Sequence, residues 1–131
     1  MYQKILDIKS FLPNKGISLE QMSKSFDYKI EYLKNKIGFS FWPRLEEGEG
    51  VSEMAYHAAK KLQENNPEIF LKSKLLICVT QNPDYKFPTT ANLLQDRLNL
   101  GKDMICFDIN QGCSGYVVGL NAASAIMNEN N

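Results

Sequence analysis

Cys113 is the residue of this chain whose type and surroundings most clearly suggest chemistry. It follows a mostly apolar run, Ile105 to Ile109, and a polar break at Asn110-Gln111-Gly112. Small and apolar residues then fill positions 115–126, so the pattern predicts a buried strand before the cysteine and a helix after it. Free backbone N–H groups and the positive end of a helix dipole favour an anion at such a turn. We therefore predict a nucleophilic thiolate at Cys113 that still needs a base or a second donor for full activation.

Two other interpretations of Cys113 have to be weighed. A buried cysteine with a packing role is the simpler one, but Gly112 and the nearby Gly115 allow a tight turn and the close approach of a ligand. A cysteine in the nucleophile elbow of an α/β-hydrolase is the other. That motif requires a glycine at position 111, where this chain has Gln111, and a histidine after the nucleophile, and none follows. The hydrolase interpretation is therefore disfavoured.

The other residues of catalytic or metal-binding type give weaker evidence of a functional site. His57, the single histidine, falls on the polar stripe of a helix predicted from Ser52 to about residue 65, and we expect it to point to solvent rather than to serve Cys113. Cys78 and Cys106 lie inside apolar strands and are expected to pack in the core. Since the three cysteines form no CxxC pair, neither a disulfide framework nor a metal site is predicted.

Composition narrows the class of protein. The chain has 131 residues, of which 44% are hydrophobic and 23% charged, and its 15 basic side chains balance 15 acidic ones. That length suits one domain with a sizeable core, and the neutral balance gives no sign of a nucleic acid or membrane partner. Charges interrupt the N-terminus before a signal-peptide core could form, and no apolar run approaches membrane-spanning length. We expect a soluble cytoplasmic protein.

The order of predicted elements indicates an α/β domain with a largely parallel sheet. Residues 4–11 have the mixed pattern of a first strand, and Ser18 with Gln21 forms a capping box at the start of a helix. A second helical stretch follows Asp27 and ends at Gly38, and residues 39–42 are aromatic and extended. After the helix that begins at Ser52, the prediction continues with a strand at 75–80, a loop at 81–88, a helix at 89–98, and then the strand and helix that flank the cysteine.

These residues resemble a known family. The segment from Phe107 to Tyr116, FDINQGCSGY, with Gly119-Leu120 and Ala122-Ala123 behind it, is similar to the nucleophile segment of the ketoacyl-acyl-carrier-protein synthase III family, within the thiolase-like condensing enzymes. Other family-like motifs occur in the same order along the chain: Leu12-Pro13, Ile37-Gly38-Phe39, Val51 to Ala55, Ala58-Ala59, Pro83-Asp84 and Phe87-Pro88. The resemblance implies the N-terminal half of a thiolase-like fold, with a mixed, mostly parallel sheet flanked by helices over residues 1–131 and the C-terminal half absent.

The resemblance also implies an activity, acyl transfer in two halves. An acyl group would move from coenzyme A or a carrier protein to Cys113 and then condense with a malonyl thioester as carbon dioxide leaves, in fatty acid or related acyl-chain biosynthesis. Tyr32 stands where the family often has a tryptophan that stacks on the adenine of coenzyme A, and Lys36 where an arginine is usual. Phe87 matches a residue that lines the acyl pocket of the partner in a homodimer. Acyl-coenzyme A is thus implied as substrate and acyl carrier protein as partner, with no tightly bound cofactor and no metal.

The family's histidine and asparagine belong to a second half that this chain does not contain. The predicted helix after Cys113 also indicates a missing half, because a helix that is apolar nearly all round must be buried nearly all round. Its small stripe includes Gly115 and Gly119, and Val117, Val118 and Leu120 lie elsewhere on its circumference. We therefore expect this chain alone to be nearly inactive in condensation and to expose faces through which it could self-associate. The alternative is a non-catalytic half-domain that binds an acyl carrier protein or a partner chain.

Overall fold

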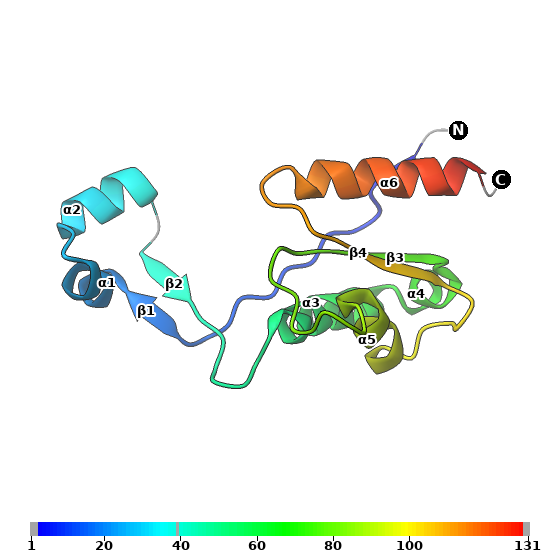
Figure 1. Ribbon diagram of the computed structural model, residues 1–131, viewed down its shortest axis with the longest axis horizontal. Coiled ribbons are helices and arrows are strands. Elements are labelled where there is room, and N and C mark those ends of the chain that lie inside the picture. Colours follow the sequence, from blue (N-terminus) through cyan, green and yellow to red (C-terminus); the bar gives the residue numbers. More distant parts are fainter. Residues whose placement is uncertain (1–2, 39, 130–131) are drawn as a thin grey trace. The chain divides into compact units, whose positions relative to one another are not determined.

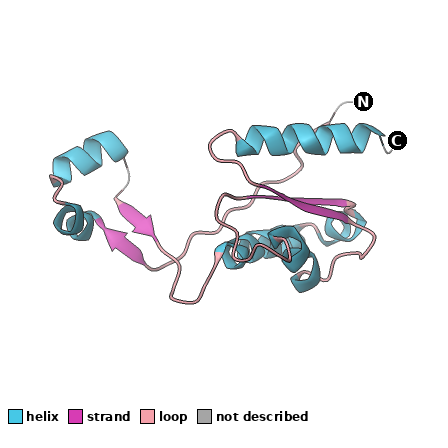
Figure 2. Cartoon of the chain, viewed as in Figure 1, coloured by secondary structure: helices cyan, strands magenta, loops and turns pink. Residues whose placement is uncertain are grey.

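The computed structural model describes residues 3–38 and 40–129. The chain forms two compact units. The larger unit contains the N-terminal segment up to Phe11 together with the chain from Gly50 onward, and the smaller unit is Leu12–Glu49. Figure 1 names the elements and Figure 2 shows their types. None of the helices in the described ranges is both long enough and apolar enough to cross a membrane.

The larger unit has three layers around two parallel strands. β3 (Leu75–Val79) pairs with β4 (Ile105–Ile109) so that Leu75 lies opposite Ile105 and Val79 opposite Ile109. Helix α6 (Gly115–Glu129) covers one face of this pair, and α3 (Val51–Asn65) and α5 (Thr90–Arg97) lie on the other face (Figure 1). The short helix α4 (Pro67–Lys72) connects α3 to β3. The cysteine turn therefore leaves the sheet on the α6 side.

The core lies between the strands and α5. Its buried members come from α5 and from the turn that follows it: Leu94, Leu98, Leu100 and Met104. Ala55, Ala59, Leu76 and Cys106 pack against them from α3 and the two strands. Because successive side chains of a strand point to opposite faces, Leu76 and Cys106 face this core, while the alternate residues of β3 face α6.

Two glycines allow α6 to approach the sheet closely. A Cβ atom built on Gly115 would lie 2.5 Å from Cγ1 of Val79, and one built on Gly119 would lie 3.1 Å from Cγ2 of the same residue. The small-residue stripe of this helix therefore faces β3. On the other side of the helix Val117 is 67% exposed, so only one face of α6 is covered within this unit.

The smaller unit is a hairpin with a helical arm. β1 (Gly16–Ser18) pairs antiparallel with β2 (Phe41–Pro43). Helix α1 (Leu19–Phe26) starts with the predicted capping box, in which the Ser18 hydroxyl accepts from Gln21 N and the Gln21 side chain accepts from Ser18 N. Helix α2 (Ile30–Tyr32) continues into a π-helical turn, Leu33–Ile37, which ends at Gly38 with a φ of 81°. The glycine cap was predicted, since this left-handed conformation is easiest for glycine.

The prediction of a first strand at residues 4–11 is wrong. This segment has no regular secondary structure, and side-chain contacts hold it instead. The side chain of Gln3 donates to Ser124 O of α6 at 3.2 Å, Asn66 Nδ2 donates to Asp7 at 2.8 Å, and Lys61 Nζ donates to Ser10 O at 3.0 Å. A strand needs a neighbour for its backbone N–H and C=O groups, and no strand in the described ranges pairs with this segment.

The remaining differences concern whole elements or the residues at which they end. Parallel pairing in the described part of the chain is confined to β3 and β4, because the other pair, β1 and β2, is antiparallel. The prediction also missed α4, although Pro67 at its first turn is a common start signal for a helix. The strand predicted to include Thr80 ends at Val79, but Thr80 N still donates to Ile109 O at 3.1 Å. The predicted extended stretch at 39–42 is confirmed where it overlaps β2, while residue 39 lies outside the described residues.

Candidate active site

Cys113 lies in the turn between β4 and α6, as the sequence predicts. The strand ends at Ile109, the helix begins at Gly115, and the cysteine is exposed between them. Gly115 N donates to Gly112 O at 2.8 Å, and the Gln111 side chain donates to the Ser114 hydroxyl at 2.7 Å. These two hydrogen bonds enclose the cysteine, so the turn is held by its own residues.

Gly112 permits a second contact of this turn. A Cβ atom at this position would lie 2.8 Å from Oε1 of Gln81, which belongs to the loop after β3. Any larger residue at position 112 would have to displace the Gln81 side chain. The glycine before Cys113 therefore brings together the two loops that leave the ends of the parallel strands, which is a frequent place for function in α/β folds.

An apolar groove of about 610 Å³ runs from Cys113 along α6. Leu75, Ile77 and Val79 of β3 form one wall, and Tyr116, Gly119, Leu120, Ala123 and Met127 of α6 form the other. Gln111, Gly112 and Cys113 stand together at one end of it. The side chains of the two walls are apolar apart from the Tyr116 hydroxyl, so the groove suits an apolar group next to the sulfur.

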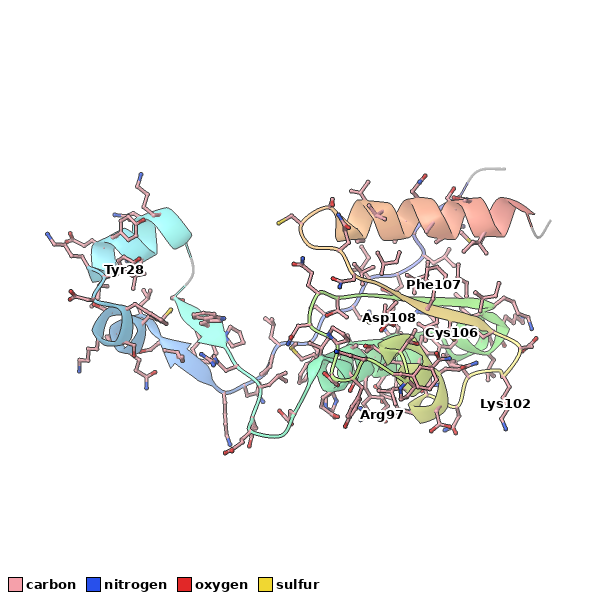
Figure 3. All side chains as sticks on the ribbon, viewed as in Figure 1. Tyr28, Arg97, Lys102, Cys106, Phe107 and Asp108 are labelled. Carbon is pink, nitrogen blue, oxygen red and sulfur yellow. The ribbon has the colours of Figure 1, made fainter. Side chains whose placement is uncertain are left out.

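The other two thiols have a different environment. Burial, together with the negative charges of Asp108 and Asp84, raises the pKa of Cys78 to about 11. Burial also raises the pKa of Cys106, which faces the α5 side of β4 in Figure 3. Both cysteines pack in or against the core, as expected, and both are poor nucleophiles at neutral pH because the thiolate is the reactive form. Cys113 is the exposed thiol of the three.

His57 lies on α3, away from the cysteine groove. Its side chain is 44% exposed, which agrees with the predicted solvent-facing position, but it has partners that the sequence pattern did not indicate. Its Nε2 lies 3.1 Å from Glu53 Oε1, its ring stacks on Phe11 at 4.6 Å, and Glu53 also pairs with Arg97 at 3.0 Å. The groove, as far as the structure describes it, is lined without a histidine. Within the described residues, no group of three or more His, Cys, Asp and Glu side chains could hold a metal ion.

The three predicted substrate-binding residues lie in two places. Phe87 belongs to the larger unit, in the loop after β3, and is 86% exposed. Tyr32 ends α2 in the smaller unit, where it is 50% exposed and stacks on Tyr28 with ring centroids 5.6 Å apart. Lys36 is an exposed residue of the π-helical turn in the same unit.

Sequence reasoning missed several residues around the cysteine. Gln81, Gln111 and Ser114 shape the turn, and two carboxylates, Asp84 and Asp108, accept hydrogen bonds from the first N–H groups of α3 and α5. The spacing of Gln111 and Ser114 could have suggested their contact. The carboxylate contacts join residues far apart in the sequence, so no local pattern could have found them.

Comparison with known proteins identifies the relatives of this chain. No family model matches it. The beta-ketoacyl-acyl-carrier-protein synthase III of Xanthomonas campestris is 34% identical over 124 residues, which are 94% of this chain and 38% of that protein. The enzyme of the same name from Alkalilimnicola ehrlichii is 30% identical over 122 residues, 93% of this chain and 38% of that protein. The chain is similar to the N-terminal part of ketoacyl-acyl-carrier-protein synthase III. This confirms the resemblance noted in the sequence.

Solved structures agree with the synthase III resemblance. The synthase III from Thermus thermophilus superposes with a TM-score of 0.89 at 25% identity, over 98% of this chain and 39% of that one. The synthase III from Aquifex aeolicus gives a TM-score of 0.86 at 28% identity, over 97% of this chain and 41% of that one. The fold is therefore thiolase-like, as predicted. The chain spans well under half of the length of these relatives.

Proposed function

We propose that this chain is the nucleophile-bearing part of a cytoplasmic acyltransferase of the ketoacyl-acyl-carrier-protein synthase III type. The observation that carries the proposal is the exposed Cys113 at the end of an apolar groove, in a turn that two hydrogen bonds hold in place. The names of the relatives supply the reaction class, since they are ketoacyl synthases acting with an acyl carrier protein. The product would serve fatty acid or related acyl-chain biosynthesis.

The first half-reaction loads the cysteine. The Cys113 thiolate attacks the carbonyl carbon of an acyl thioester, a sulfur–carbon bond forms, and the thiol of coenzyme A or of the carrier protein leaves with a proton. Backbone N–H groups at the start of α6 are the natural donors to the oxyanion of this step. Tyr32 and Lys36 would contact the adenine and phosphate groups of coenzyme A, and Phe87 would line the acyl pocket of the partner in a homodimer.

The second half-reaction makes the carbon–carbon bond. A malonyl thioester loses carbon dioxide, its α-carbon attacks the acyl carbonyl on Cys113, and the sulfur leaves as thiolate. This step needs groups that stabilise the enolate formed by decarboxylation. The described lining of the groove contains neither a histidine nor an asparagine, the pair that the family resemblance implies for this task, so we assign it to residues beyond the matched region. The isolated chain should then load an acyl group far better than it condenses one.

A turnover assay tests the proposed function. The gene product, purified at its natural length, is given acyl-coenzyme A and a malonyl-acyl carrier protein, and the 3-oxoacyl product is measured by mass spectrometry. We expect turnover that Cys113→Ala abolishes and that Cys106→Ala leaves largely intact. Turnover that does not change in Cys113→Ala would rule the proposal out.

The exposed outer face of α6 favours one alternative, a non-catalytic half-domain that binds a carrier protein or a partner chain. In that case the natural product would be stable at 131 residues and indifferent to Cys113→Ser. Pull-down with an acyl carrier protein, compared between the parent and Cys113→Ser, separates the two functions, because a binding role predicts equal capture and no acyl adduct.

A further inference from the structure

The loop between β3 and α5, residues 80–89, combines exposed aromatic side chains with a fixed backbone. Tyr85 and Phe87 are 61% and 86% exposed, so packing of their own rings does little to order the loop. Polar contacts at several points along the loop do so instead. We call this segment the Phe87 loop.

Asp84 fastens the middle of the Phe87 loop to helix α3. Its two carboxylate oxygens accept from Val51 N at 2.5 Å and from Ser52 N at 3.0 Å. Helix α3 has Gly50 at its N-cap and therefore no capping side chain of its own, so Asp84 supplies the acceptor that the first turn lacks. A Cβ atom at Gly50 would overlap the Asp84 carboxylate, so the glycine makes room for this contact.

Asp108 fastens the end of the Phe87 loop to β4. Its oxygens accept from Thr90 N at 2.7 Å and from Ala91 N at 2.8 Å, and both of these residues are buried. Figure 3 shows Asp108 on the side of β4 that faces α5. The start of α5, immediately after the loop, is therefore tied to the strand that leads to Cys113.

The beginning of the loop is held as well. Thr80 N donates to Ile109 O at 3.1 Å, and the Gln81 side chain lies against Gly112, next to the cysteine. The loop is thus attached to β4, to the cysteine turn, to α3 and to α5, with Phe87 between the Asp84 and Asp108 contacts.

We propose that Asp84 and Asp108 are positioning residues that hold the Phe87 loop rigid relative to the Cys113 turn. The ring of Phe87 is exposed to solvent, but the backbone of Phe87 is held in a single conformation. A rigid Phe87 loop would also help to select the acyl chain, and this consequence rests on the proposed function, in which Phe87 lines a partner's acyl pocket. The rigidity of the loop itself is independent of that function.

Backbone ¹⁵N relaxation of this chain tests the proposal. In the parent we expect order parameters near 0.85 for residues 84–88, equal to those of β3 and β4, because about 0.85 is typical of rigid backbone. Asp84→Asn replaces one acceptor oxygen by a donor, and the order parameters of residues 85–87 should fall below about 0.6, the flexible range. The order parameters of β3 and β4 are the internal reference. They should stay unchanged in Asp84→Asn, whereas a general loss of stability would lower them as well.

Two further variants make the result specific. Gly50→Ala leaves the Asp84 carboxylate in the sequence but displaces it, and should loosen the same residues. Asp96→Asn, an exposed aspartate of α5, makes the same change of charge and should leave the loop as in the parent. Asp108→Asn should loosen residues 87–91, and if it does not fold, Asp84→Asn and Gly50→Ala decide the question. A parent loop that is already flexible, or a rigid loop in both Asp84→Asn and Gly50→Ala, would overturn the proposal.

The failure of this inference is distinct from a failure of the proposed function. If neither the parent nor any variant is acylated on Cys113 while the loop behaves as described, the proposed acyltransferase function is wrong and the positioning role stands. If acylation occurs and the loop is rigid without Asp84, the acyltransferase stands and the positioning role is lost. Where both hold, Asp84→Asn in the natural gene product should change the ratio of kcat/KM values between short and longer acyl thioesters, as Phe87→Ala does.

Discussion

At the scale of single residues, the three cysteines differ because of where their side chains lie. Cys78 is opposite Asp108 in the sheet, and both Asp84 and Asp108 add negative charge to an already buried thiol. Cys113 stands outside the core in the turn before α6. Sequence context predicted this division correctly, because β-branched and apolar neighbours indicate strand interiors and glycines indicate a turn.

Alkylation should follow this division. At pH 8 iodoacetamide should modify Cys113 first, Cys106 more slowly and Cys78 last, since a pKa of about 11 leaves Cys78 with roughly a hundredfold less thiolate than an ordinary thiol of pKa near 9. Peptide mapping of partly labelled protein measures the order. Unfolding the protein in urea before labelling is the control and should make the three rates similar. Faster labelling of Cys78 than of Cys113 in the folded chain would contradict the account.

The Cys78 thiol should also make the stability of the fold depend on pH in the alkaline range. Its pKa is about 11 in the folded chain, above the value near 9 of a free thiol, so the unfolded chain loses this proton first. The stabilisation is complete below about pH 9 and disappears as the pH rises to about 11, a change of roughly 2 kcal/mol. Urea unfolding at both pH values, compared between the parent and Cys78→Ala, isolates this contribution.

At the scale of elements, α6 illustrates how small residues set the distance between layers. Gly115 and Gly119 both face Val79, and a methyl group on Gly115 would overlap it. Helix propensity alone favours alanine over glycine by about 1 kcal/mol, so packing and propensity oppose each other at this position. We expect the overlap to outweigh the gain in helix propensity, because the atom in the way is Cγ1 of Val79, a β-branched side chain with few alternative rotamers.

Gly115→Ala should therefore destabilise the chain by about 1–3 kcal/mol despite its better helix propensity. Urea unfolding of four proteins, the parent, Gly115→Ala, Val79→Ala and the double variant, measures the coupling between the two side chains. We expect the double variant to recover part of the loss. Asn121→Ala, at an exposed position of α6, is the matched control and should be neutral or slightly stabilising. Additive effects of the two substitutions would show that the contact is unimportant.

Elements with local signals could be predicted from the sequence. The capping box of α1, the glycine at the end of the π-helical turn, both parallel strands and α6 all depend on residues within a few positions of one another. Residues 4–11 could not be placed correctly, because a strand also requires a neighbour, and here Asp7 and Ser10 bond to side chains of α3 and its C-terminal turn. The Asp84 and Asp108 contacts join positions 33 and 18 residues apart, so their partners depend on the tertiary fold.

At the scale of the whole molecule, the main feature is the exposed side of α6, which no other described part of its own unit covers. Val117 is 67% exposed on the side of α6 away from β3, and Tyr116 and Leu120, which line the groove beside β3, are 61% and 45% exposed. The sequence predicted this problem, since a helix apolar nearly all round requires a layer on each side. The relatives, which are more than twice as long as the matched region, have additional chain that could supply such a layer.

An exposed apolar helix face should make the isolated chain self-associate. Sedimentation velocity between about 5 and 200 μM should show a concentration-dependent rise in the average mass, because burial of apolar surface contributes about 25 cal/mol per Å². Val117→Glu should reduce this rise. Asn121→Glu adds the same charge at an exposed polar position of the same helix and should have a smaller effect. A chain that stays monomeric at every concentration would show that this face does not cause self-association.

The central claim is that Cys113 accepts an acyl group from a thioester. The most direct measurement is peptide mapping by mass spectrometry after a brief incubation of the natural-length gene product with acyl-coenzyme A and no malonyl thioester. The account predicts a single acyl adduct on Cys113, released by hydroxylamine and absent from Cys113→Ala. An acyl group on another residue, or no adduct while the protein still makes a 3-oxoacyl product, would contradict it.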